Sequence, residues 1–271
     1  MSTTDFLGEV EAVARAGAEP LIHHWRHLEP GQVIEKARND LVSDADRAAE
    51  AAILAEVARR FPDHRVLSEE SGWKGQPGTS PTWIVDPLDG TTNFVHGVPH
   101  FAVSIGVAVG GRVDAAVILD PIKGDLFRAA RGHGAWWNGT PCRVSRQPAL
   151  EGALLATGFP FRALALLDPY LAIFRDVFRR CQGIRRLGSA ALDLAYTACG
   201  IFDGFFEFEL QPWDVAAGSL LVEEAGGLVT DMDGGADALA SGHVLCGPQG
   251  VHGELLEIVQ RHRSSWADAA R

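Results

Sequence analysis

The sequence predicts a layered α/β fold, and three observations support this prediction. After Ser145, short apolar segments typical of strands alternate with longer segments of helical periodicity, as in folds that layer helices on sheets. Before that point, Gly110-Gly111 separates two apolar runs, which is the signature of a β-hairpin. The 271 residues are 46% hydrophobic and 22% charged, a globular composition that excludes disordered, collagen-like and coiled-coil chains.

Two helices are expected near the N-terminus. Apolar residues recur at helical spacing over residues 5–28, where Thr4 is a plausible N-cap and Pro20 should kink or split the helix. A second helix should begin after Ser43 or Asp44 and end at Arg60, before Pro62. The strands expected after it are residues 65–67, 82–85, 101–109 and 112–119.

Near residues 145–152 the sequence changes to an alternation of strand-like and helical segments. This change predicts two units, 1–147 and 148–271. The expected strands of the second unit are residues 153–157, 204–208, 228–231 and 243–246. Its expected helices are residues 170–180, 190–198 and 215–225, with a last helix that begins near Gly250.

The chain is acidic and has no obvious targeting segment. Its 24 Lys+Arg and 35 Asp+Glu give a net charge of −11, which should repel nucleic acid and anionic membranes. The N-terminus lacks the pattern of a secretory signal, and no apolar run approaches the ~18 residues of a membrane span. A cytoplasmic protein is therefore expected. The widely spaced Cys142, Cys181, Cys199 and Cys246 predict neither a zinc site nor a disulfide framework, and suggest a reducing compartment.

The segment Asp86–Asn93 (DPLDGTTN) follows a predicted strand and carries two acids three residues apart. Converging carboxylates repel each other unless a proton or a cation intervenes. Ligand sets made only of oxygen favour Mg²⁺ over zinc. Thr91-Thr92 could open a helix whose N–H groups would bind phosphate. A surface turn is the alternative, because D-P and D-G dipeptides are common in turns.

Two further acidic segments favour the metal site over the turn. Glu69 and Glu70 follow another predicted strand, and only one of two adjacent side chains is expected to reach a shared metal. Asp214 follows Pro212 where a helix should begin, a position that on its own favours a simple N-cap.

These segments (SEES at 68–71, DPLDGTTNF at 86–94 and WDVAAG at 213–218) resemble the three hallmark motifs of inositol monophosphatases, in the same order and spacing. Residues 188–194 and 223–227 are also similar to family segments. The resemblance implies an αβαβα sandwich of the inositol monophosphatase and fructose-1,6-bisphosphatase type, with an α+β half and an α/β half. It further implies a homodimer and a lithium-sensitive, Mg²⁺-dependent phosphomonoesterase.

The resemblance also assigns roles to residues. The metal ligands for two or three Mg²⁺ would be Glu69, Asp86, the Leu88 carbonyl, Asp89 and Asp214. The catalytic residues would be Asp46, which orients the attacking water with Thr91 as its partner, and Glu69. Gly90 and Thr91 would bind phosphate, and Glu207, Ser189 and Ala190 would line the substrate pocket. Ser43 stands where the family more often has Thr, which keeps the hydroxyl.

The implied substrate is a small phosphorylated polyol, first of all myo-inositol monophosphate. Histidinol phosphate, fructose-1,6-bisphosphate and 3′-phosphonucleotides remain alternatives, because relatives use the same metal centre. A non-catalytic interaction protein on this fold is the alternative of another class. Arg185-Arg186 could hold an anionic substrate or pair with acids at a subunit contact. Solvated positions are expected for Lys36, Asp44 and the cluster His23, His24 and His27, and a core or dimer contact for Trp136-Trp137.

Overall fold

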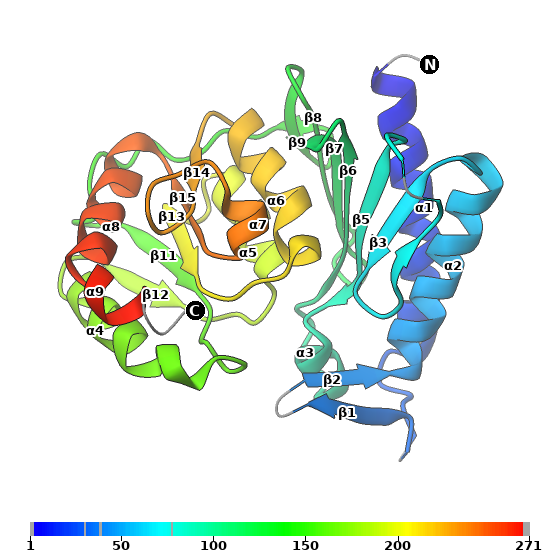
Figure 1. Ribbon diagram of the computed structural model, residues 1–271, viewed down its shortest axis with the longest axis horizontal. Helices are drawn as coiled ribbons and strands as arrows, with labels where there is room; N and C mark the ends of the chain where they lie inside the picture. The colour runs from blue at the N-terminus through cyan, green and yellow to red at the C-terminus, as the bar shows by residue number, and fades with distance from the viewer. Residues whose placement is uncertain (1–2, 30, 38–39, 77, 268–271) are drawn as a thin grey trace.

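The computed structural model describes residues 3–29, 31–37, 40–76 and 78–267, and its elements stack in five layers (Figure 1). Helices α1 (Thr3–His24) and α2 (Asp44–Arg60) cover the outer face of a first sheet. Helices α5 (Ala190–Ala198) and α6 (Pro212–Glu224) lie between this sheet and a second one. Helices α4 (Leu167–Phe178) and α8 (Gln249–Arg261) cover the far side. The predicted αβαβα order is confirmed.

The first sheet has eight strands in the order β10-β9-β8-β7-β6-β5-β3-β4. The strands are β3 (Arg65–Ser68), β4 (Gly72–Lys74), β5 (Thr82–Asp89), β6 (Ala102–Val109), β7 (Arg112–Asp120), β8 (Asp125–Ala130), β9 (Gly134–Trp137) and β10 (Thr140–Pro141). A separate hairpin of β1 (Val33–Ala37) and β2 (Asp40–Ser43) lies beside the short helix α3 (Thr91–Val95).

The second sheet has five strands in the order β12-β11-β13-β15-β14. The strands are β11 (Leu154–Thr157), β12 (Gly183–Arg185), β13 (Gly204–Glu207), β14 (Leu228–Thr230) and β15 (Val244–Gly247). The short helices are η1 (Leu164–Leu166), α7 (Ala238–Ser241) and α9 (Arg263–Trp266). All strands of this sheet follow residue 148, but the predicted division of the chain into two units stays a prediction.

The first sheet is buried on both faces, which explains why β6 and β7 are almost continuously apolar. Val103 and Ile105 pack with the apolar side of α1, whereas Ile118 packs with α5 and α6. Gly106 lets α6 approach closely, because a Cβ at this position would lie 2.9 Å from the Cβ of Ala216. This close contact brings the N-terminus of α6 to the edge of β5.

The predicted split at Pro20 and the predicted N-cap at Thr4 are both absent from α1. Pro20 lies inside α1 without splitting it, since the buried Val13 and Leu21 hold both sides of the helix against the sheet. The helix begins at Thr3, so Thr4 is not its N-cap. Strand β5 continues past Pro87 to Asp89, with a bulge in its pairing to β6 between Asp86 and Asp89. The bulge accommodates a residue that cannot donate a hydrogen bond.

The expectation about cysteines was also wrong, because Cys142 and Cys199 form a disulfide. They are 57 residues apart in the sequence, but the end of α5 brings Cys199 beside the segment after β10, with 4.6 Å between the Cα atoms. Only the tertiary fold creates this proximity. Cys181 and Cys246 are free thiols.

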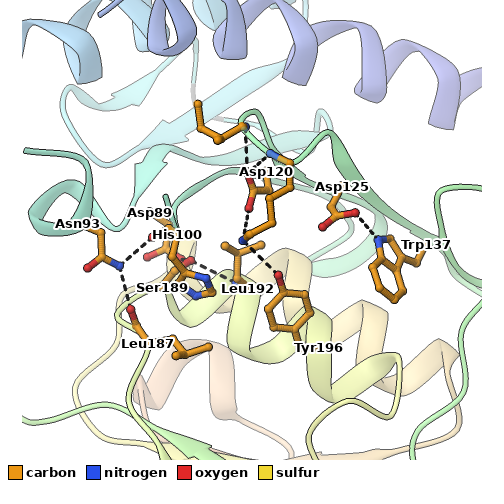
Figure 2. A network of polar contacts seen from close by, with 12 residues as sticks. Asp89, Asn93, His100, Asp120, Asp125, Trp137, Leu187, Ser189, Leu192 and Tyr196 are labelled. Atoms are coloured by element: carbon orange, nitrogen blue, oxygen red, sulfur yellow. Dashed lines mark hydrogen bonds and ion pairs between the residues drawn. The ribbon is translucent and has the colours of Figure 1, made fainter. Parts of the chain in front are cut away.

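The structure also places the tryptophan pair, the histidine cluster and Asp44. Trp136 and Trp137 pack against opposite core clusters, and the Trp137 indole donates to Asp125 (Figure 2). His23 and His27 are exposed, whereas His24 and Asp44 are half-buried, and Asp44 pairs with Arg47. The side chain of Lys36 lies outside the described part. Over the described ranges, no helix is both long enough and apolar enough to cross a membrane.

Candidate metal centre

Three carboxylates converge at the junction of the two halves. Asp86, Asp89 and Asp214 each offer an oxygen, and these oxygens lie within 4.8 Å of one another. The bulge in β5 turns both Asp86 and Asp89 toward this point, and α6 supplies Asp214 from its first turn. At most 9% of each residue is exposed.

Hydrogen bonds to the protein fix one oxygen of each carboxylate. Asp89 Oδ2 accepts from the Ser189 hydroxyl at 2.5 Å (Figure 2). The same oxygen accepts from the Ala191 amide at 2.7 Å. Asp214 Oδ2 accepts from the Gln211 amide at 2.7 Å. Asp86 Oδ1 accepts from the amide of Leu88 at 2.9 Å. The three carboxylates are thus preorganised by contacts that do not neutralise their charge.

The pKa of each of the three carboxyls is raised, first of all by burial. Burial, followed by the charges of Glu69, Asp89 and Asp214, raises the pKa of Asp86 well above its ordinary value. Burial and the Asp89 charge raise the pKa of Asp214 to about 7. A divalent cation would relieve both the desolvation and the repulsion. The residues therefore fit Mg²⁺, which prefers carboxylate and carbonyl oxygen.

Glu69 lies at the edge of this cluster, in the turn after β3. Its amide donates to the carbonyl of Val85 at 3.2 Å, which holds the turn against β5. Its side chain lines the adjacent cavity and lies 4.0 Å from the Arg162 guanidinium. Glu70 does not line that cavity. That only one of the pair reaches a metal stays a prediction.

The predicted contact between Asp46 and Thr91 is present. Thr91 Oγ1 lies 3.0 Å from both Asp46 Oδ1 and the Leu88 carbonyl, and its single proton can serve one of them at a time. Asp46 Oδ2 accepts from the Ser43 amide and hydroxyl at 2.8 and 2.5 Å, closing the capping box of α2. Burial raises the pKa of Asp46. Thr91 lines the cavity and Asp46 lies behind it, so Asp46 reaches the site through Thr91.

Gly90 and Asn93 hold the two halves together beside the carboxylates. Gly90 has a φ of 99°, and a Cβ there would lie 3.1 Å from the carbonyl oxygen of His100. Asn93 Nδ2 donates to the carbonyls of His100 and Leu187, each at 2.8 Å (Figure 2). Sequence reasoning saw Asn93 only as part of a motif and gave it no role.

A cavity of about 480 Å³ opens beside the carboxylates. All the residues predicted to bind metal, phosphate or substrate line this cavity, including Ser189, Ala190 and Glu207. Of the predicted site residues, Asp46 alone does not line it. Burial raises the pKa of Glu207 to about 8. Gly158 lies against this side chain, because a Cβ there would come within 1.8 Å of Glu207 Oε1. The Ser189 hydroxyl donates to Asp89, so it also positions a metal ligand.

Sequence reasoning missed one wall of the cavity, the loop 158–162. Its Phe159 and Phe161 rings lie 5.6 and 5.0 Å from the guanidinium carbon of Arg186. The Gly-Phe-Pro-Phe sequence indicates a turn, but no feature of the neighbouring sequence predicts that this turn lies beside the three carboxylates. Asp193, also in the wall, was missed because it lies inside an apolar helix.

Comparison with known proteins decides the family. The profile described as "Inositol monophosphatase family" matches residues 5–264. The chain belongs to this family. "Nus factor SuhB" of Pseudomonas aeruginosa is 48% identical over 254 residues, which are 92% of this chain and 93% of that protein.

Two solved structures of family members are similar over nearly their full length. The extragenic suppressor protein suhB of Bartonella henselae is 42% identical with a TM-score of 0.91, covering 95% of this chain and 99% of that one. The inositol monophosphatase of Anabaena (Nostoc) sp. PCC 7120 is 39% identical with a TM-score of 0.85, covering 95% and 96%. The fold of these structures therefore applies to this chain, and membership of the family supports phosphatase activity.

Proposed function

We propose that this protein hydrolyses a phosphate monoester with Mg²⁺, and that its substrate is myo-inositol monophosphate. The observation that carries the proposal is the cluster of Asp86, Asp89 and Asp214, held in place and uncompensated in the wall of a cavity. The name of the Anabaena relative supports the choice of inositol phosphate. A homodimer stays the expectation drawn from the family resemblance, and a cytoplasmic location stays the expectation drawn from the sequence.

The metal would be held by Asp86, Asp89 and Asp214, with Glu69 and the Leu88 carbonyl completing the ligand set. When bound, Mg²⁺ would lower the pKa of a water molecule, and its positive charge would stabilise the leaving alkoxide. All five residues line the cavity, so a phosphate group there meets the ligands directly.

Thr91 and Asp46 would orient the attacking water and take its proton. The Thr91 hydroxyl faces the cavity and donates back to Asp46 or to Leu88, which leaves its lone pairs toward the water. The raised pKa of Asp46 suits a group that receives a proton through this hydroxyl. The amides of Gly90 and Thr91 would hold phosphate oxygens, and Glu207 would bind a substrate hydroxyl.

The test is phosphate release from a panel of esters at fixed Mg²⁺. Wild-type protein should release phosphate from myo-inositol monophosphate fastest, and histidinol phosphate, fructose-1,6-bisphosphate and adenosine 3′,5′-bisphosphate test the alternatives. The Asp89→Asn variant should lose nearly all activity with its fold retained. The asparagine oxygen would keep the bonds from Ser189 and Ala191, which turns its NH₂ group toward the metal. Full turnover by Mg²⁺-loaded Asp89→Asn would refute the assignment.

A second function is favoured by the name of the Pseudomonas relative, "Nus factor SuhB". We propose that this chain also binds transcription factors of its own organism. Co-elution of the purified protein with purified factors would test this, and Asp89→Asn separates the two roles. Binding retained without phosphatase activity would make the interaction independent of catalysis.

A further inference from the structure

Asp193 is a buried acid whose place in α5 directs it into the cavity. Its amide donates to the carbonyl of Ser189 at 3.0 Å, one helical turn earlier. Residues four apart share a helix face, and the Ser189 hydroxyl faces the site because it holds Asp89. Asp193 is 1% exposed and forms part of the cavity wall.

The carboxyl of Asp193 has an unfilled hydrogen-bonding site. Its Oδ1 is buried and has no partner among the described residues. Buried polar atoms normally have one, because desolvation without a partner is costly. The rest of α5 is almost entirely small or apolar (AALDLAYTA), so an apolar residue at 193 would pack without this cost. An orphaned acid in a cavity wall indicates that a ligand supplies the missing partner.

Glu207 lies in the same wall and provides a second carboxyl. Asp193 and Glu207 line the same cavity, and the charge of Glu207 adds to the burial that raises the pKa of Asp193. They come from different elements, α5 and β13, and Gly158 leaves the space that Glu207 occupies. Two carboxyls in one cavity wall can each accept a hydrogen bond from a different hydroxyl group of one ligand. Each of those hydroxyl groups needs such a partner once it is buried.

We propose that Asp193 is a specificity-determining residue that, together with Glu207, hydrogen-bonds neighbouring hydroxyls of the substrate. The inference rests on the proposed phosphatase function and narrows its substrate class to phosphate monoesters of polyols with adjacent free hydroxyls. A monoester without hydroxyls would leave Asp193 unpartnered and gain nothing from it.

The test compares two esters in Asp193→Leu and Asp193→Asn. For myo-inositol monophosphate, kcat/KM should fall roughly ten- to hundredfold in Asp193→Leu and less in Asp193→Asn, whose amide still forms hydrogen bonds. For p-nitrophenyl phosphate, which has no hydroxyl, kcat/KM should stay within about twofold. Asp120→Asn, a buried acid outside the cavity, is the matched control and should leave the ratio of the two rates unchanged. Thermal unfolding verifies that each variant is folded.

Binding without turnover provides an independent readout. In an Asp46→Asn background, calorimetry should show weaker binding of myo-inositol monophosphate when Asp193→Leu is added, with unchanged binding of inorganic phosphate. Equal losses for both esters, or no loss for either, would overturn the inference and make Asp193 a purely structural residue. If the wild-type protein cleaves p-nitrophenyl phosphate but neither binds nor cleaves inositol phosphate, the inference about Asp193 is overturned and the phosphatase proposal stands. Protein that cleaves no ester refutes the phosphatase, and calorimetry then still decides the role of Asp193.

Discussion

Replacing Asp214 by asparagine should stabilise the metal-free protein, although it removes a proposed metal ligand. The Gln211 amide donates to Asp214 Oδ2 at 2.7 Å, and the asparagine oxygen can accept the same bond. The N-terminal cap of α6 is therefore retained. What the substitution removes is one of three like charges in a buried cluster.

The size of the effect follows from the pKa of Asp214. Burial and the Asp89 charge raise this pKa from 3.8 to about 7. The native state therefore holds its proton at a higher pH than the unfolded state, and stability falls as the pH rises from 3.8 to about 7. At pH 8 the full cost is about 4 kcal/mol. Asparagine does not ionise, so the metal-free variant should melt about 8–12 °C higher at pH 8.

Thermal unfolding in a chelating agent, at pH 8 and at pH 4, measures this effect. The two proteins should differ at pH 8 and nearly coincide at pH 4, where the wild-type carboxyl is largely protonated. Added Mg²⁺ should raise the melting temperature of the wild type and leave the variant almost unchanged, because binding to the native state alone stabilises it. A variant no more stable than wild type at pH 8 would refute the electrostatic reasoning.

Three further substitutions test other parts of the site and the fold. Asp46→Asn should lower kcat at least about 100-fold while calorimetric Mg²⁺ affinity is kept, and lost affinity would instead place Asp46 among the ligands. Gly158→Ala should raise KM for inositol phosphate and not for p-nitrophenyl phosphate, because the added Cβ would displace Glu207. An unchanged KM for inositol phosphate would show that displacing Glu207 does not weaken substrate binding. Cys142→Ala should lower the free energy of unfolding by about 4 kcal/mol, because the disulfide closes a long loop. If neither the substitution nor added reductant changes the melting temperature, the bond contributes no stability.

The sequence contained enough local information to predict most elements near the site. Helix α2 begins at its Ser43 cap and ends at Arg60 as expected, and the Gly110-Gly111 hairpin is present. Helix α5 matches its predicted bounds, Ala190–Ala198. These elements have strong periodicity or specific turn residues, so their signals are local.

The missed features depend on contacts between distant segments. The strands β9 and β12 have four and three residues, too few to show a period, and pairing with neighbouring strands defines them. The Cys142–Cys199 bond and the wall formed by residues 158–162 exist only because the two halves meet. The family resemblance located the acids, but it did not show that Ser189 holds Asp89 or that Asp193 lacks a partner.

The hydrogen bonds between the end of β5, with α3 after it, and the start of α5 would make the proposed catalysis depend on how these two layers pack. Asp89 belongs to the first half but takes its orientation from Ser189, whereas Leu187 belongs to the second and is anchored by Asn93. A slight separation of the layers would therefore disorient a metal ligand before either sheet loses a strand. Loss of turnover in increasing denaturant should precede loss of secondary structure, which makes activity a sensitive gauge of how tightly the layers are closed.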